Sequence, residues 1–222
     1  MVFPNLISLD FDGDLEYLED ILSSFKTPIL KESGFHLFNQ LVFDAPLLGH
    51  FIWCTETFMT IHKACVKFFT SAVWVTLLGR EEMAYSNREA LKLRISCKPL
   101  DWQLSAVTQV LNSLLPSLPT LESLEITVIH KDWQGQIEVT QCQEFLHPFT
   151  SVKEMTLVHK YSVQLVAPAL RELASEGATE VLPALQNIFL MTFPWRPSGL
   201  IKEAIEHFVA TRRLYGQPVI DH

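Results

Sequence analysis

Glycine, cysteine and long apolar runs are scarce in this sequence, and each shortage excludes a class of site. Only 8 glycines occur in 222 residues, which leaves little material for a loop that cradles phosphate. The four cysteines, Cys54, Cys65, Cys97 and Cys142, are never closely spaced, so neither a disulfide framework nor a zinc knuckle is indicated. No apolar run approaches the roughly 18 residues that a membrane span requires.

Positive charge is also in short supply. The chain has 17 Lys and Arg against 25 Asp and Glu, a formal net charge of −8 and a pI near 5.5. This balance argues against nucleic acid or an anionic membrane as the main partner. The first residues show no basic leader and no signal-type apolar core. Together with the unpaired cysteines, these features predict a cytoplasmic or nuclear protein.

The sequence does contain a degenerate repeat of apolar residues. The pattern apolar-x-x-apolar-x-x-apolar-x-apolar occurs in residues 3–11 (FPNLISLDF), 118–126 (LPTLESLEI), 149–157 (FTSVKEMTL) and 182–190 (LPALQNIFL). Taken as equivalent positions, Leu93, Leu124, Met155 and Ile188 are separated by 31, 31 and 33 residues. A nearly constant period of this size is typical of a solenoid.

Helical patterns separate these expected strands. They cover residues 15–25, 46–58, 104–114, 163–174 and 201–212, with a further helix capped by Thr140 and with Ser198 as the N-cap of the last. Residues 64–69 and 72–78 suggest a β-hairpin, and residues 79–89 a surface loop. Repeated strand–helix units predict an α/β fold with a mostly parallel sheet and helices on its outer face. We expect a single domain over residues 1–222, less regular in 1–89 and regular in 90–222.

The acidic stretch Ile7–Leu15, ISLDFDGDL, admits two interpretations. Asp10 and Asp12 stand as the nucleophile and general acid do in haloacid-dehalogenase-like phosphatases, and such an enzyme is one alternative. However, Asp14 replaces the usual Thr or Val, and no later strand ends in adjacent acids that could hold magnesium. In the repeat register, Asp10 is simply an outward strand position, and residues 12–14 form the turn that follows.

Other catalytic and metal-binding patterns are weak. His50 and Cys54 are one helical turn apart but lack a further pair of ligands, so neither a metal nor a cofactor is predicted. A Ser/His/Asp triad can assemble from distant residues, and the sequence leaves that possibility open. The five tryptophans, Trp53, Trp74, Trp102, Trp133 and Trp195, are expected to lie mostly in partly buried core positions.

The repeat resembles a degenerate leucine-rich repeat, Leu-x-x-Leu-x-Leu. Nearly the whole chain is similar to the C-terminal leucine-rich-repeat-like region of F-box proteins from mushroom-type fungi. The segments that carry the resemblance are FPNLISLDFDGDLEYLEDIL, FNQLVFDAPLLGHFI, DWQLSAVTQVLNSLLPSLPTLESLEI, LHPFTSVKEMTLV and TEVLPALQNIFL. In such proteins an F-box recruits the ubiquitin-ligase adaptor and the repeats recognise a substrate. Because a repeat strand follows Met1 almost at once, we expect the F-box itself to be missing here.

These patterns predict an incomplete, degenerate leucine-rich-repeat-like solenoid that recognises a protein and is not an enzyme. The alternative to a free-standing module is a truncated fragment without independent function. We expect no binding of the ligase adaptor by this chain alone, and self-association through its N-terminal edge strand. The expected partner-binding residues form an outward strand row, namely Asp10, Arg94, Glu125, Thr127, Thr156, Phe189 and Met191.

The interpretation of Asp10 as an outward strand residue can be tested directly. The Asp10→Asn substitution should leave the fold intact, because it replaces one exposed polar side chain by another of the same size. Thermal unfolding followed by circular dichroism would check this. A magnesium-dependent phosphatase activity that disappeared in the variant would overturn the interpretation.

Overall fold

The computed structural model describes residues 5–24, 30–38, 43–80, 87–97, 99–114, 118, 120–129, 137–175, 180–191, 199–216 and 219–221. These residues form an α/β fold with one nine-stranded sheet in the order β1-β2-β5-β4-β3-β6-β7-β8-β9. The strands are β1 Ser8–Gly13, β2 Glu32–Leu37, β3 Ile61–Phe68, β4 Ala72–Arg80, β5 Asn87–Ser96, β6 Ser123–Val128, β7 Glu154–Val158, β8 Asn187–Met191 and β9 Ile220–Asp221. The helices are α1 Leu15–Ser24, α2 Pro46–Cys54, α3 Leu100–Leu114, α4 Val139–Leu146, α5 Lys160–Ser175 and α6 Gly199–Leu214, with a 3₁₀ helix η1 at Glu56–Thr60.

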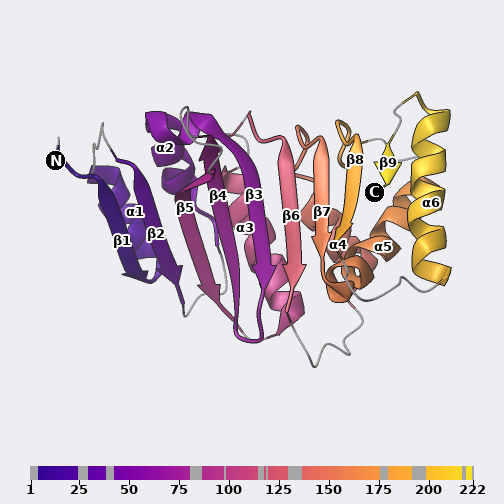
Figure 1. Cartoon of the computed structure of the whole chain (residues 1–222). Coiled ribbons are helices and arrows are strands. Elements are labelled where there is room, and N and C mark those ends of the chain that lie inside the picture. The colour runs from indigo at the N-terminus through magenta and orange to yellow at the C-terminus, as the bar shows by residue number, and fades with distance from the viewer. Residues whose placement is uncertain are drawn as a thin grey trace.

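The described elements form two layers. Helices α1 to α5 lie behind the sheet, and α6 lies at the far end beside β9 (Figure 1). Apolar residues alternate along each strand, and those that face the helices, such as Phe35, Leu93 and Ile126, are buried in one continuous core. No described helix covers the opposite side of the sheet (Figure 1), which we call the open face. The expected mostly parallel sheet with helices on one side is therefore confirmed.

One strand runs against the others. Strand β4 pairs antiparallel with both β3 and β5, whereas every other pair in the sheet is parallel. The predicted hairpin is β3–β4, but β5 then continues it, so these three strands enter the sheet in reverse order. The surface loop expected at 79–89 is shorter than predicted. Its ends belong to β4 and β5, and residues 81–86 lie outside the described part of the chain.

The strand register corrects one of the repeat positions. Leu124, Met155 and Ile188 are direct neighbours across β6, β7 and β8, as the repeat predicted. The prediction that Leu93 is equivalent to Leu124 is wrong, because Leu93 is level with Val75, Val66 and Ile126 across the sheet. The residue of β5 at the level of Leu124 is Leu91. The pattern in β5 alternates over several leucines, so periodicity alone could not choose between the two.

The two N-terminal helices form as predicted, and α1 caps α2 in a way that the sequence did not reveal. Leu15, Leu18 and Leu22 of α1 are buried, as expected. Helix α2 begins at Pro46, and its N-cap residue makes no side-chain hydrogen bond to the helix. Instead, the Glu19 carboxylate of α1 accepts hydrogen bonds at 2.8 Å from the backbone N–H groups of Leu47 and Leu48. An anion at a helix N-terminus is stabilised by the free N–H groups there.

Three helix boundaries differ from the prediction. Phe58 lies in η1, because α2 ends at Cys54. Thr140 is inside α4 rather than its N-cap, a position held by Glu138 without a side-chain bond. Helix α5 begins at Lys160, earlier than the expected start at residue 163, and it continues through Pro168. The expected cap Ser198 lies outside the described residues.

Arg212 near the end of α6 is buried, which the sequence did not predict. Its guanidinium donates to the carbonyl oxygens of Val181 and Leu182 at 2.5 and 3.1 Å. Burial lowers the pKa of Arg212 below its ordinary value, since a charged group loses hydration there. These bonds tie α6 to the segment that leads into β8.

The terminal position of β1 generates a prediction about self-association. Among the described strands β1 pairs only with β2, so its other edge presents backbone groups that a second chain can pair with. We expect self-association that rises with concentration, and the Ser8→Lys substitution should weaken it by adding charge at this edge. Sedimentation velocity over a concentration series measures both effects. Ser123→Lys on the interior strand β6 is the matched control. A monomer at all concentrations would contradict the expectation.

Candidate functional site

Side chains on the open face form rows that cross the sheet, because its strands pair in register. We define the first row as Asp10, Gly34, Lys92, Thr76, Cys65, Glu125, Thr156 and Phe189. The second row is Asp12, His36, Arg94, Trp74, Lys67, Thr127, Val158 and Met191. All seven residues expected from the sequence lie in these two rows. The structure thus places on one face of the sheet positions that are up to 181 residues apart in the chain.

The exposure of these residues is uneven. Met191 is 63% exposed, whereas Phe189 is half-buried. Thr127 was expected to be exposed, but it is buried, at 4%. Its neighbours across the sheet are Lys67 and Val158, which flank the threonine on both sides. The long stem of Lys67 can cover it. Thr127 is therefore a buried member of the second row and is not exposed for contact with a partner.

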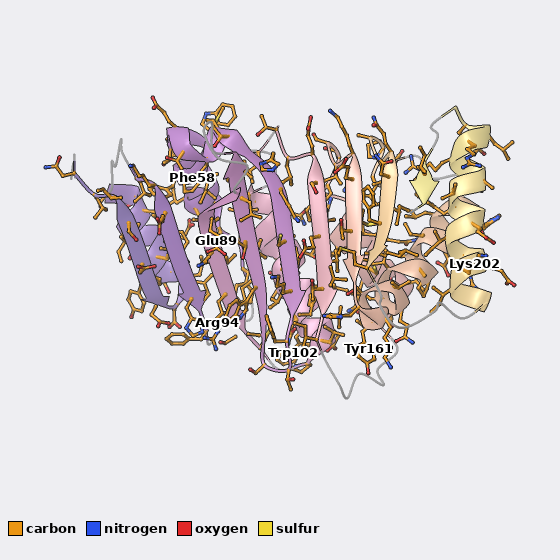
Figure 2. All side chains as sticks on the ribbon, in the orientation of Figure 1. Phe58, Glu89, Arg94, Trp102, Tyr161 and Lys202 are labelled. Carbon is orange, nitrogen blue, oxygen red and sulfur yellow. The ribbon has the colours of Figure 1, made fainter. Side chains whose placement is uncertain are left out.

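The middle of the open face is basic although the chain as a whole is acidic. Four cations lie on the two strands that flank β4: Lys63 and Lys67 on β3, and Lys92 and Arg94 on β5. Arg94 lies over the ring of Trp74, with its Cζ 5.7 Å from the ring centroid, a cation–π arrangement. Trp74 itself is 42% exposed. Figure 2 shows Glu89 and Arg94 on the same strand, with Arg94 nearer its carboxyl end.

Two of these cations are paired. Lys92 forms an ion pair with Glu89 of the same strand. Lys63 Nζ lies 2.6 Å from Glu125 Oε2, across the β3–β6 boundary. Burial acts to lower the pKa of Lys63, but the hydrogen bond and charge of Glu125 outweigh it and hold that pKa above its ordinary value. Glu125, an expected contact residue, is thus half-buried and engaged with Lys63.

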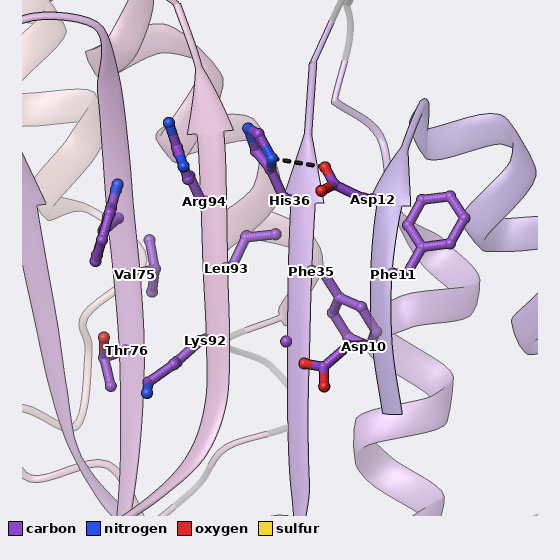
Figure 3. Close-up of a pocket in the computed structure, with 12 residues that line it drawn as sticks. Asp10, Phe11, Asp12, Phe35, His36, Val75, Thr76, Lys92, Leu93 and Arg94 are labelled. Atoms are coloured by element: carbon purple, nitrogen blue, oxygen red, sulfur yellow. Dashed lines mark ion pairs between the residues drawn. The ribbon is translucent and has the colours of Figure 1, made fainter. Parts of the chain in front are cut away.

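A hollow of about 360 Å³ opens over β1, β2, β5 and β4 on this face. Gly34 leaves space for the Asp10 carboxylate at its edge, because a Cβ atom at this position would lie 2.3 Å from Asp10 Oδ1. Asp10 and Asp12 line one side, and Lys92 and Arg94 line the other, with His36 between them (Figure 3). The hollow therefore offers groups of both charges, beside the ring of Trp74.

A chain of hydrogen bonds crosses three strands at the rim of this hollow. Asp12 Oδ1 of β1 lies 2.6 Å from His36 Nδ1 of β2, the contact dashed in Figure 3. On the other side of the ring, His36 Nε2 lies 2.7 Å from Ser96 Oγ of β5. The sequence had left a Ser/His/Asp constellation open without naming its members. Only the strand order, which places β5 beside β2, brings Ser96 to His36.

The acidic stretch that suggested a phosphatase lies at the edge of the sheet. Asp10 is on the terminal strand β1, as the repeat interpretation requires, and not on a central strand. Asp12 and Gly13 continue this strand, so the expected turn is reduced to Asp14. Within the described part of the chain, no group of three or more His, Cys, Asp and Glu residues could hold a metal ion.

The tryptophans differ from expectation. Trp53, Trp74 and Trp102 are 52%, 42% and 57% exposed, whereas mostly partly buried core positions were predicted. Trp133 and Trp195 lie outside the described residues. Of the three described tryptophans, Trp74 alone is on the open face, since Trp53 and Trp102 belong to α2 and α3. His50 and Cys54 are in contact on the surface of α2, with 3.5 Å between Nε2 and Sγ.

Comparison with known proteins adds no relative: no family model, no curated protein and no solved structure matches the chain. Within the described residues, the helices are all too short or too polar to cross a bilayer. The candidate site therefore stands on its own geometry.

Cysteine chemistry can test the packing of the first row. Burial first, and then the charge of Glu125, raise the pKa of the Cys65 thiol to about 11. Because the thiolate is the nucleophile, Cys65 at pH 8 should react with iodoacetamide on the order of a hundredfold more slowly than exposed Cys54. Its rate should rise steeply between pH 8 and 10.

A substitution of Glu125 separates the effect of its charge on the alkylation rate of Cys65 from the effect of burial. Glu125→Gln removes a charge that disfavours the thiolate, so alkylation of Cys65 should become faster. Glu144→Gln, an exposed change on α4, is the control. Peptide mass spectrometry after timed alkylation gives both rates. Equal rates for Cys65 and Cys54 in the folded protein would contradict the packing described here.

Proposed function

We propose that this chain is a protein-recognition module that binds its partner through the open face. The observation that carries the proposal is the pair of continuous side-chain rows on a sheet face that no described helix covers. In most α/β folds with parallel strands, both faces are covered. A sheet that buries one face and exposes the other offers side chains that can vary without disturbing the core. Such a surface suits recognition better than a closed catalytic pocket does.

The dimensions of the rows favour a long, extended contact. Strands in a sheet are roughly 4.8 Å apart, so a row across eight strands spans roughly 34 Å. A specific interface commonly takes about 800 Å² from each partner, which this face can supply. A partner segment that crosses the strands would meet acidic, then basic, then apolar positions in turn.

The side chains of the second row indicate which chemical groups the partner should carry. Its centre holds Arg94, Trp74 and Lys67, and its far end holds Val158 and Met191. We propose a partner with an acidic group opposite the centre and an apolar side chain opposite Met191. Complementary charge favours encounter and register, while the apolar anchor supplies most of the affinity.

The architecture is further proposed to be an incomplete leucine-rich-repeat-like solenoid, the substrate-binding part of an F-box-type ubiquitin-ligase receptor. Support comes from β6, β7 and β8, where Leu124, Met155 and Ile188 recur in register. Consecutive parallel strand–helix units are found there, as in such repeats. We expect the described chain to bind a substrate protein and not the ligase adaptor, because the adaptor would be the partner of a separate F-box module.

The affinity of a captured partner for variants of the open face tests this proposal. Phe189→Ala and Met191→Ala should each weaken binding about tenfold or more, since truncation of an interface anchor can cost about 2 kcal/mol. Glu125→Ala should cost less, because Glu125 is engaged with Lys63. A pull-down from native cell extract would supply the partner, and calorimetric titration the affinities.

The control is Met59→Ala, the same change at an exposed methionine in η1. All variants should keep the melting temperature of the native chain within a few degrees. Unfolding of Phe189→Ala would make that residue part of the core. Binding that is insensitive to both anchor variants, or direct binding of the ligase adaptor, would overturn the proposal.

A further inference from the structure

Three side chains from three strands are linked at the rim of the hollow on the open face. Asp12, His36 and Ser96 are joined by contacts of 2.6 and 2.7 Å, one at each nitrogen of the imidazole ring. We propose that they form a nucleophilic triad, with Ser96 as nucleophile, His36 as general base and Asp12 as the group that orients it. The activity would be hydrolysis of small esters, and it is independent of the recognition function proposed above.

The positions of the protons follow from the chemistry of the groups. A carboxylate can only accept a hydrogen bond, so His36 Nδ1 must donate to Asp12 Oδ1. In the neutral imidazole Nε2 is then the acceptor, and Ser96 Oγ must donate to it. This is the direction in which a serine gives up its proton to a general base, with the acid holding the base in the required tautomer.

A contact with Phe38 also restricts the orientation of the His36 ring. His36 makes an edge-to-face contact with Phe38, with 5.5 Å between the ring centroids. The His36 side chain is 28% exposed, so substrate and water can reach it, whereas Asp12 is 71% exposed. Because solvent screens the Asp12 carboxylate, its influence on the base is weaker than that of a buried acid. We therefore expect a slow enzyme that acts on activated esters.

The hollow beside His36, to which Ser96 is bonded, provides room for a substrate and a cation for its charge. His36 and Arg94 both line the hollow of about 360 Å³, which is large enough for a small acyl group. Arg94 is the cross-strand neighbour of His36 and precedes Ser96 by two residues on the same face. Two residues along a strand are roughly 7 Å, so the guanidinium can reach an oxyanion formed at Ser96. The exposed ring of Trp74 beside Arg94 can stack against an aromatic leaving group.

The reaction balances without any added reagent except water. Ser96 Oγ attacks the ester carbonyl carbon while its proton passes to His36 Nε2. The carbon–oxygen bond to the alcohol then breaks, and the alcohol leaves with the proton from His36. Water, deprotonated by His36 in the same way, attacks the acyl-serine. The carboxylic acid is released, and the proton returns to Ser96.

A fluorophosphonate probe on the full chain tests the nucleophile. The oxygen of an activated serine attacks the phosphorus of the probe, an O–P bond forms and fluoride leaves. Peptide mass spectrometry then shows which serine carries the adduct. We expect one adduct, at Ser96, at pH 8 in the folded protein and none after heat denaturation. Ser96→Ala should abolish it, and Ser123→Ala, a serine on the same face of β6, should leave it unchanged.

Two further variants separate catalysis from a merely structural link between strands. His36→Gln keeps a side chain that can bond to both neighbours but cannot take up the proton, so the labelling rate should fall on the order of a hundredfold. Asp12→Asn should lower it at least about tenfold. Circular dichroism melting checks that both variants remain folded.

Turnover completes the test. The native chain should hydrolyse p-nitrophenyl acetate at pH 8, and Ser96→Ala should not, because it has no hydroxyl to take up the acyl group. Absence of an adduct at Ser96 in the native chain would overturn the proposal. So would a labelling rate that His36→Gln does not change.

Discussion

Burial of one side of the sheet against the helices is the constraint on which the rest of the structure depends. It requires every strand to turn its apolar residues the same way, so the alternate residues must all emerge on the other side. Leu91, Leu124 and Ile188 lie at one level of the core, while Lys92, Glu125 and Phe189 lie at the same level outside it. The open-face rows are therefore a by-product of core packing. Their chemistry is free to vary because the fold depends on the opposite row.

The reversed insertion of β3, β4 and β5 determines what those rows contain. It places two long strands of the hairpin in the middle of the sheet, where Lys63, Lys67 and Arg94 surround Trp74 and Glu125. It also puts β5 next to β2, which brings His36 to Ser96. Without the reversal, β3 would be the neighbour of β2, and these contacts could not form. The basic centre and the hydrogen-bond chain at the hollow thus have one topological origin.

Much of the fold could be predicted from local patterns. The repeat gave the register of β6, β7 and β8, and periodicity located α1, α3 and α6, because these features depend on residues close in sequence. Strand order is not local, so neither the neighbours of β2 nor the level of Leu93 could be inferred. The burial of Thr127 depends on the side chains of two flanking strands, and its exposure was predicted wrongly for that reason. The seven expected contact residues do share one face, but Trp74, Lys67 and Ser96 were missed as members of its chemistry.

The pairing of β2 with β5 has a consequence for the order in which the chain can assemble. Ser33 lies beside Leu91, so the partner of β2 is 58 residues further along and must exist before β2 can dock. In a simple repeat array each unit pairs with the next, and structure can spread stepwise from any nucleus. Here the first two strands have to wait for the hairpin that follows them. Folding should begin in the middle of the chain, and the N-terminal edge of the sheet should form last. Because β2 pairs with a strand distant in the sequence, this last step should be slow.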